Sequence, residues 1–436
     1  MTGAPSGSAR VSSSSFRLPA TLALLVVFAL IVAFVPTGGR PRAARAQDVA
    51  APIDPSVPEE FAGIELPGGW GETDLQVFVK ATGHTLLGTM LDYWRATGGA
   101  ATYGNPISEP FASADGRYSQ AFENAIFQYM PEKLRTNDPT MTLMPIGDDA
   151  LRTRIGNFRR DGRREGGGGD RRGDLWRPLS PKGDVAKQAV ADGGRFVKKT
   201  RHTISGSFLE WYERHDGAFY LGNPLSQPLV ERGVRVQYFQ GGLLMRERDG
   251  EVRLAPIARS LAKRLGIDTT RTERAGLPLY DESLFASAPN PYPRGDQNAP
   301  GIKRVEVSIG KQLLKAYQGN ELVMQTPVST GLAPNFTERG RFHVWLKFFT
   351  EDMFGTTAAD GSVTGVGPGA TGGASYVVND VPHVMYVNTD LEAMHGAYWH
   401  NNFGQPMSHG CINLPLDVAA WMFGWAPIGT QVTVSD

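Results

Sequence analysis

The chain has 436 residues, of which 41% are hydrophobic and 10% aromatic, so it can form two to four folded domains and is not disordered throughout. Its 44 basic and 44 acidic residues give a formal net charge of zero. Residues 1–46 contain basic but no acidic side chains, so the remainder is slightly acidic, which argues against general binding to nucleic acid.

An apolar run, LPATLALLVVFALIVAFV (18–35), follows Arg10 and Arg17 near the N-terminus. Basic residues before an apolar run are typical of a secretory signal, and Ala44-Arg45-Ala46 provides a cleavage site of small residues. The run also approaches the length that spans a bilayer, so residues 1–46 could instead remain as a membrane anchor. Both interpretations place the rest of the chain outside the cytoplasm, at the cell wall, the cell surface or a periplasm-like space.

Two copies of one sequence unit follow a linker over 47–77. The first copy (78–156) begins FVKATGHTLLGTMLDYWR and the second (196–266) begins FVKKTRHTISGSFLEWYE. We expect α+β units, with a short helix over 88–99 and a hairpin over 235–247. The alignment pairs His84 with His202, which we interpret as structural residues of a turn, with ligand binding as the alternative.

Two further stretches are rich in glycine, proline or charge. Residues 157–195 contain RRDGRREGGGGDRRGDLWR, which predicts a solvated, flexible linker, with binding to anionic wall polymers as the alternative. Residues 267–301 end in APNPYPRGDQNAPG, which predicts a second linker.

The last segment, 302–436, predicts a mainly β domain. Short runs of β-branched and aromatic residues are separated by Gly, Asn or Asp, and the final run, GTQVTVSD, predicts a terminal strand. PLDVAAWMFGWAP (415–427) predicts the one helix, because Pro415 suits a first turn and Pro427 stops it.

The single cysteine, Cys411, lies in MSHGCINLP (407–415) and has no partner for an internal disulfide. It could be a buried, inert thiol. It could also be a nucleophile, because we expect it to lie immediately before the helix, where the partial positive charge of a helix N-terminus lowers a thiol pKa. His395 and His409 are candidate bases, and Gly410 permits a close approach of the backbone.

The pattern His395-Gly396 followed by SHGCIN (408–413) resembles the signature of the L,D-transpeptidase catalytic domain (YkuD type), and the resemblance extends over about 302–434. It implies a β-sandwich-like fold and an enzyme that acts on peptidoglycan stem peptides without a cofactor. A cysteine acyl-enzyme would release the terminal D-alanine of a donor and pass the acyl group to an acceptor amine, giving a 3–3 cross-link. One departure is TERG (337–340), where the family usually has Thr-Pro-x-Gly.

The resemblance also implies a role for each residue of the motif. Cys411 would be the nucleophile and His395 its general base, oriented by the Gly396 carbonyl. His409 would shape the pocket, and the backbone N–H groups of 409–411, including that of Gly410, are candidates for an oxyanion hole. The residues expected to hold the loop or line the substrate site are Ser408, Asn413, His383 and Tyr386.

Several alternatives stay open. The residues that could form a zinc site are His395, His400, His409 and Cys411, although their spacing does not match common ligand patterns. The chain could be a non-catalytic wall-binding surface protein, since its repeats loosely resemble the LGFP-type repeats of bacterial surface proteins. The same thiol could also use water, as an L,D-carboxypeptidase, a free D-amino acid, or a protein amine as acceptor.

Overall fold

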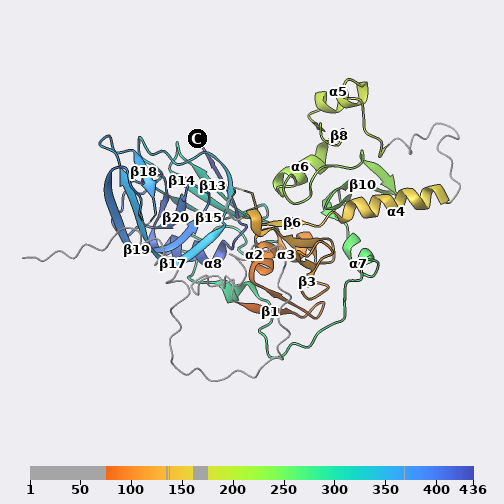
Figure 1. Ribbon diagram of the computed structural model, residues 1–436, viewed down its shortest axis with the longest axis horizontal. Helices are drawn as coiled ribbons and strands as arrows, with labels where there is room; N and C mark the ends of the chain where they lie inside the picture. The colour runs from red at the N-terminus through yellow and green to blue at the C-terminus, as the bar shows by residue number, and fades with distance from the viewer. Residues whose placement is uncertain (1–74, 134–135, 137, 161–174, 368) are drawn as a thin grey trace, which may run out of the picture.

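The computed structural model describes residues 75–436 apart from 134–135, 137, 161–174 and 368 (Figure 1). The expected signal or anchor over 1–46 therefore lies outside the described residues, as does most of the linker over 47–77. Within the described ranges, no helix combines the length and apolar character needed to cross a membrane. Two small α+β modules, drawn from orange to green, lie beside a larger β domain drawn in blue (Figure 1).

The two repeats have matching elements. Repeat 1 contains β1 (Gln76–Val79), β2 (His84–Leu87), α2 (Gly88–Ala96), α3 (Gly99–Tyr103), β3 (Phe111–Ala112), β4 (Tyr118–Ala121), β5 (Ile126–Tyr129), η1 (Pro131–Lys133), β6 (Met141–Leu143) and α4 (Ile146–Arg160). Repeat 2 contains α5 (Asp184–Ala191), β7 (Arg195–Val197), β8 (His202–Ile204), α6 (Gly206–Arg214), β9 (Leu229–Glu231), β10 (Val234–Phe239), β11 (Gly242–Arg246), β12 (Val252–Leu254) and α7 (Ile257–Ala262). The expected helix is confirmed as α2, and the expected hairpin as the antiparallel pair β10–β11.

The paired histidines make equivalent contacts in the two repeats. His84 Nδ1 lies 3.3 Å from Glu109 Oε1, and His202 Nδ1 lies 2.8 Å from Gln227 Nε2. Both rings are buried. These hydrogen bonds stay within each repeat, as expected for structural residues that satisfy buried polar atoms.

The linker expectation over 157–195 is wrong for the two ends of that segment. Residues 157–160 continue α4, and residues 184–191 form α5, whose sequence DVAKQAVA is rich in good helix formers. Residues 267–301 are also ordered: the Phe78 N–H donates to the Pro278 carbonyl at 2.8 Å, and the Tyr280 N–H donates to the Phe78 carbonyl at 3.0 Å. This linker therefore runs along the edge strand β1 before it forms η3 (Glu282–Phe285).

The repeats exchange their C-terminal helices. Leu261 of α7, in repeat 2, packs in a core with Ala121 and Ile126 of repeat 1. Leu151 of α4, in repeat 1, packs in a core with the β9–β11 strands of repeat 2. A Cβ on Gly147 would lie 1.8 Å from the Phe239 carbonyl oxygen, so α4 crosses the β10–β11 hairpin at a position that requires glycine. Each repeat therefore completes the core of the other.

The β domain is built from two five-stranded sheets. One has the order β15 (Glu321–Pro327), β14 (Leu313–Gln318), β13 (Lys303–Ser308), β22 (Gln431–Ser435) and β16 (Gly340–His343). The other has the order β18 (Val363–Val366), β17 (Leu346–Thr357), β19 (Ala374–Tyr386), β20 (Ala393–Gly396) and β21 (Ile412–Leu414). One apolar core joins both sheets with the helix α8 (Leu416–Trp425). The mainly β fold with one helix, the helix over 415–427 and the final strand are confirmed.

Three cations hold the C-terminal end of α8. Lys347 Nζ donates to the Phe423 carbonyl, Arg95 Nη2 donates to the Gly424 carbonyl at 3.2 Å, and Lys303 Nζ donates to the Trp425 carbonyl at 2.9 Å. Helix ends leave carbonyl groups unpaired and carry partial negative charge, so cations stabilise them. Arg95 comes from α2, and thus repeat 1 contributes directly to this helix end.

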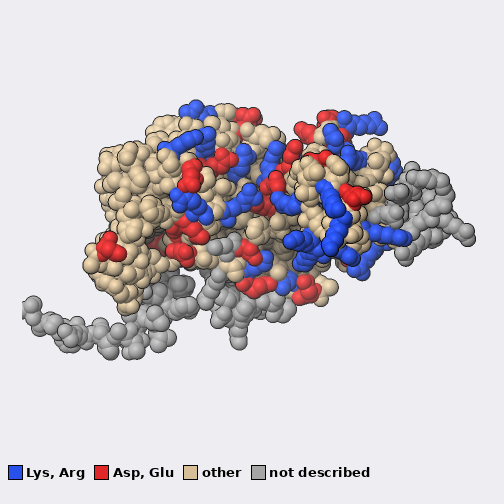
Figure 2. Space-filling model, turned by 90° about the horizontal axis from the view of Figure 1, so that it is seen from above, with Lys and Arg blue, Asp and Glu red and all other residues tan. Residues whose placement is uncertain are grey.

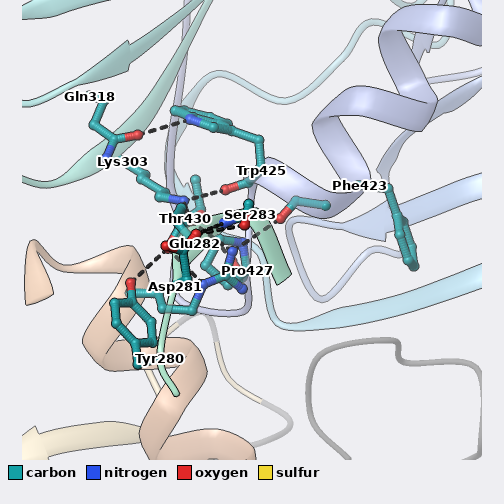
Figure 3. A network of polar contacts seen from close by, with 12 residues as sticks. Tyr280, Asp281, Glu282, Ser283, Lys303, Gln318, Phe423, Trp425, Pro427 and Thr430 are labelled. Atoms are coloured by element: carbon teal, nitrogen blue, oxygen red, sulfur yellow. Dashed lines mark hydrogen bonds and ion pairs between the residues drawn. The ribbon is translucent and has the colours of Figure 1, made fainter. Parts of the chain in front are cut away.

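Glu282 balances two of these cations. Its Oε1 lies 2.8 Å from Arg95 Nη2. Oε1 also contacts Lys303 Nζ, and Oε2 accepts from the Tyr280 hydroxyl at 2.7 Å (Figure 3). Burial favours the protonated carboxyl, but the charges of Lys303 and Arg95 outweigh it and hold the pKa of Glu282 well below its usual range. The linker, repeat 1 and the β domain meet at this carboxylate.

Repeat 2 makes a second joint with the β domain. Asp216 lies 3.0 Å from His343 Nε2 and 2.9 Å from Arg341 Nη1, and it also accepts from Gln431. Figure 2 shows acidic and basic side chains gathered over the repeats and the junction, whereas the far end of the β domain carries few charges on this face. The joints therefore combine these polar contacts with an apolar core that includes Tyr93 of repeat 1, Tyr220 of repeat 2 and Ile428 of the β domain.

Replacing Glu282 with Gln is expected to destabilise the chain, because it removes the negative charge that lies against Arg95 and Lys303. We expect a loss of about 3 kcal/mol in the free energy of unfolding, near the low end for broken buried pairs, since the Glu282 side chain keeps 30% of its surface exposed. In the natural chain this contribution is present above about pH 4.5 and is lost as the pH falls further, because the folded-state pKa is lowered. Chemical denaturation at pH 7 and pH 3 measures both effects. The exposed Glu273→Gln serves as control, and equal losses from both variants would contradict the prediction.

The helix exchange predicts that damage to α7 appears in the other repeat. Leu261→Ala should cost about 2–5 kcal/mol of local stability, as for other buried leucines. Hydrogen exchange should accelerate in β4 and β5 of repeat 1 more than in β10 and β11 of repeat 2. Val190→Ala, at a position 51% exposed, is the control. Acceleration confined to repeat 2 would show that the helices are not exchanged in solution.

Candidate active site

The pairing of β20 with β21 places the two main candidate residues on one face of the sheet. The strands are parallel, and His395 lies opposite Asn413 while Met394 lies opposite Ile412. Side chains alternate along a strand, so Met394 and Ile412 enter the core while His395 and Asn413 face away from it. Cys411 directly precedes β21 and shares the parity of Asn413. The thiol and the imidazole are therefore diagonal neighbours on the face away from the core.

His395 is buried and held in one orientation. Its Nδ1 lies 3.1 Å from the Gly396 carbonyl oxygen, which can only accept, so Nδ1 carries the proton and Nε2 is left as an acceptor. Burial lowers the pKa of His395 to about 4, against the opposing effect of the Gly396 carbonyl. The imidazole is thus neutral at pH 7 and can accept a proton at Nε2. Gly396 itself faces α8, where a Cβ would lie 3.3 Å from that of Ala419.

Cys411 is half-buried and is also neutral. Burial raises the pKa of its thiol to about 12. A hydrogen bond from the Ala393 backbone lowers it, while the carboxyl groups of Glu392 and Glu351 raise it further. The resting site therefore contains a neutral thiol and a neutral imidazole rather than a thiolate and an imidazolium.

The expectation that Cys411 lies immediately before the helix is wrong. Residues Ile412–Leu414 form β21, and α8 begins only at Leu416. Three extended residues span about 10 Å, and the field of a helix terminus falls off within about one turn. The helix does not lower the pKa of the thiol, and the burial of the sulfur determines its protonation.

Hydrogen bonds on both sides hold the loop before Cys411. The Gly410 N–H donates to Ser408 Oγ at 3.2 Å, and the Ser408 hydroxyl donates to the Cys411 carbonyl. The Thr337 hydroxyl donates to the Gly410 carbonyl at 2.6 Å. Gly410 has a φ of +129°, and a Cβ there would lie 3.0 Å from Glu392 Oε1. Both the conformation and the space therefore require glycine at this position.

Asn413 of β21 lies between His395 of β20 and Ser329. Its backbone exchanges two hydrogen bonds with Ser329, at 2.8 and 3.1 Å. Its side-chain amide lies 2.9 Å from Nε2 of His400, a residue that the sequence named only in the zinc alternative. The hydrogen bond between Asn413 and His400 therefore holds the side chain that lies opposite His395.

His409 is exposed and stacks on Tyr376, with ring centroids 4.9 Å apart. Tyr376 belongs to β19, which forms a flap together with β17 and β18. Asn335 holds the turn between β17 and β18, because its side-chain amide donates to the Gly361 carbonyl at 2.8 Å. His409 therefore lies at the exposed rim of the site, against Tyr376.

The two residues expected to line the substrate site differ in position. Tyr386 pairs with Ala393, so it shares the face of Cys411, and its hydroxyl donates to Glu351 Oε2 at 2.8 Å. His383 instead packs against Phe349 and against Phe423 of α8, with ring centroids 6.3 and 5.5 Å away. The expectation that His383 lines the substrate site is therefore corrected, because its ring packs against α8.

Three residues that sequence reasoning did not assign belong to the site: Glu392, Glu351 and Thr337. Glu392 stands three positions before His395, and Thr337 belongs to the unusual TERG turn, so both were close to sequence signals. Within the part of the chain that the structure describes, no group of three or more His, Cys, Asp or Glu residues could hold a metal ion. Within these residues, the structure therefore offers no ligand cluster to the zinc alternative.

Comparison with known proteins yields one family. Residues 302–434 match the family model of the L,D-transpeptidase catalytic domain (YkuD). The "Putative L,D-transpeptidase YqjB" of Bacillus subtilis (strain 168) is 26% identical over 156 residues, which cover 35% of this chain and 83% of that protein. The solved catalytic domain of the E. faecium L,D-transpeptidase is 26% identical, with a TM-score of 0.26, covering 30% of this chain and 95% of that one. An L,D-transpeptidase from Mycobacterium smegmatis is 23% identical, with a TM-score of 0.26, covering 32% and 63%.

The neutral resting thiol predicts slow and strongly pH-dependent alkylation. The rate of reaction of Cys411 with iodoacetamide should still be rising at pH 9, because the thiol pKa is raised to about 12. The same protein in denaturant should approach a plateau above about pH 9, since an exposed cysteine has a pKa of about 8.5. Mass spectrometry of the time course measures both rates. A rate in the folded protein that reaches its maximum below pH 8 and does not rise again up to pH 9 would show that the resting residue is a thiolate.

Proposed function

We propose that this chain, whose residues 302–434 belong to the L,D-transpeptidase catalytic domain family, is an exported enzyme that forms 3–3 cross-links in peptidoglycan. The observation that carries the proposal is the placement of Cys411 and His395 on one face of the sheet, with His395 Nε2 free to accept a proton. A nucleophile and a base in this arrangement are what acyl transfer requires.

The first half-reaction forms a thioester. His395 Nε2 takes the thiol proton as the Cys411 sulfur bonds to the carbonyl carbon of the third residue of a donor stem peptide. The C–N bond to the terminal D-alanine then breaks, and the imidazolium returns the proton to the leaving amine. Because both groups are neutral at rest, proton transfer accompanies attack rather than preceding it.

Backbone N–H groups are the candidates for stabilising the oxyanion. The Gly410 N–H is already bonded to Ser408 Oγ, which leaves the N–H groups of His409 and Cys411. The Gly410 carbonyl is held by Thr337, and a planar trans peptide directs the Cys411 N–H to the opposite side. Thr337 thus orients one oxyanion donor before substrate arrives.

The second half-reaction returns the free thiol. An acceptor amine bonds to the thioester carbon, His395 takes a proton from that amine, and the C–S bond breaks with return of the proton to sulfur. Water would give a carboxypeptidase by the same steps, a free D-amino acid would give exchange, and a protein amine would give attachment to the wall. The scheme uses only groups of this chain.

The repeats are proposed to hold the enzyme at the envelope, with residues 1–46 directing export. The joints at Glu282 and Asp216 attach both repeats to the β domain. A wall polymer bound to the repeats would therefore lie at a fixed distance from Cys411.

Loss of the nucleophile should abolish product without unfolding the chain. We expect Cys411→Ala to form no cross-linked product and no carbapenem adduct, and His395→Gln to lose about 10²–10⁴-fold in turnover, the usual contribution of a general base. Mass spectrometry of stem peptides, with and without an acceptor amine, separates transpeptidation from hydrolysis. Binding of Cys411→Ala to isolated cell walls should equal that of the natural chain.

Cross-linking by the alanine variant would refute the thiol mechanism. Stoichiometric metal in the purified protein, together with loss of activity on chelation, would favour the zinc alternative. Wall binding by an otherwise inactive natural chain would favour the non-catalytic alternative.

A further inference from the structure

We propose that Glu392 is a positioning residue that controls when Cys411 ionises, and that the unusual residue Glu338 tunes it. The inference rests on the proposed thiol chemistry, since it concerns the same nucleophile. It adds a carboxylate to a site otherwise described by its cysteine and histidines.

Glu392 is fixed by a set of convergent hydrogen bonds. Its two carboxylate oxygens each lie 3.1 Å from the backbone nitrogen of Glu338, and Oε2 accepts from Asn388 Nδ2 at 2.9 Å. Its own backbone N–H donates to Asn388 Oδ1 at 2.9 Å. Asn388 is fully buried. The carboxylate therefore has a defined position, and that position is against Gly410, next to the nucleophile.

The backbone donor at position 338 requires a residue other than proline. Proline, the usual residue at this position in the resemblance, has no N–H and could not bond to Glu392. The Glu338 side chain adds a second effect, because its Oε2 accepts from the same Asn388 amide at 2.9 Å. Glu338 thus contributes a backbone N–H that favours the ionised form of Glu392 and a side-chain charge that disfavours that form.

Charged and titratable groups face this cluster from each neighbouring element. Glu338 precedes β16, Asp390 lies in the loop between β19 and β20, and Cys411 precedes β21. Beyond the sulfur lie Glu351 of β17 and the tyrosines of β19, Tyr376 and Tyr386. His395 follows on β20 and His409 stands at the rim. Within this described set, Glu392 is the carboxyl group whose oxygen lies against Gly410.

The protonation of Glu392 is poised near neutral pH. Burial raises the pKa of Glu392 to about 7, with the Glu338 N–H and Asn388 lowering it and the charges of Glu338 and Asp390 raising it. An ionised Glu392 raises the pKa of Cys411, because a second negative charge beside it is unfavourable. Above pH 7 the carboxylate therefore opposes thiolate formation, and below pH 7 this opposition disappears.

The proposed consequence is a thiol that ionises only when His395 removes its proton during attack. Susceptibility to oxidation follows thiolate character, so a protonated thiol also resists oxidation. Such protection suits a free cysteine outside the reducing cytoplasm.

The test is the pH profile of Cys411 alkylation in the full chain. For the natural protein, the plot of log rate against pH should bend near pH 7, where ionising Glu392 slows the reaction, and rise again above pH 8. For Glu392→Gln, the same plot should be a straight line. Its rate should be about tenfold that of the natural protein at pH 8, since a change of one unit in the thiol pKa corresponds to a tenfold change in rate. The two rates should be equal at pH 5.5. Glu392→Asp should restore the bend. A Gln variant with the natural profile would overturn the proposal.

Two substitutions at 338 form a matched pair. Glu338→Ala removes the charge but keeps the N–H, so the bend should move to lower pH. Glu338→Pro removes both, so Glu392 loses a donor, and the bend should lie at higher pH than in the alanine variant. Coincident profiles for these two variants would show that the N–H has no influence. This pair also decides the question if Glu392→Gln fails to fold, which thermal unfolding would reveal.

Carbapenem trapping separates this inference from the proposed function. Natural protein that forms no adduct but shows the bend in alkylation retains the Glu392–Cys411 coupling and loses the transpeptidase assignment. Adduct formation without a bend would support the transpeptidase assignment and overturn the Glu392–Cys411 coupling. Equal loss of alkylation at every pH in Glu392→Gln would assign Glu392 a purely structural role.

Discussion

The end of α8 depends on three cations that bond to its last carbonyl groups. Lys347, Arg95 and Lys303 take the carbonyls of three consecutive residues, and Glu282 neutralises two of them. A buried helix end without such partners would leave unsatisfied acceptors, and burying Arg95 and Lys303 without the charge of Glu282 would be costly. Because α8 packs on the sheet that contains β19 and β20, a residue of repeat 1 helps to support the strands that form the site.

The site itself depends on the register between β20 and β21. A slip of one residue would send either Cys411 or His395 into the core, since neighbouring positions face opposite sides of a sheet. Ser329 pairs with Asn413 from the other side, and α8 leaves no room for a side chain at Gly396. These contacts fix the register from both edges. The thiol and imidazole are thus preorganised while both remain neutral, and proton transfer is left to the reaction.

Sequence reasoning recovered the features that are encoded locally. The periodicity around Leu91, the Gly-Gly turn after Gln240 and the proline before Leu416 predicted α2, the β10–β11 hairpin and α8. The pattern around Cys411 predicted the nucleophile, but not its protonation, because burial depends on Tyr386 and other residues from distant strands. The helix exchange, the cations at α8 and the role of Thr337 were invisible for the same reason: each joins segments far apart in the chain. Glu392 could have been suspected from its place on the His395 strand, although its partner Glu338 lies 54 positions away.

The repeats show how one fold supplies two different joints. Arg95 of α2 reaches the end of α8, whereas Glu213, at the aligned position of α6, is exposed and pairs with Arg195 of its own repeat. Repeat 2 contacts the β domain through Asp216 instead, where repeat 1 has Gly98. The hydrogen bonds that define the fold, such as those of His84 and His202, recur in both copies. The side chains that make the joints do not recur, because each copy faces a different surface of the same domain. The inner scaffold of a repeat can therefore stay constant while its outer residues determine which part of the β domain it supports.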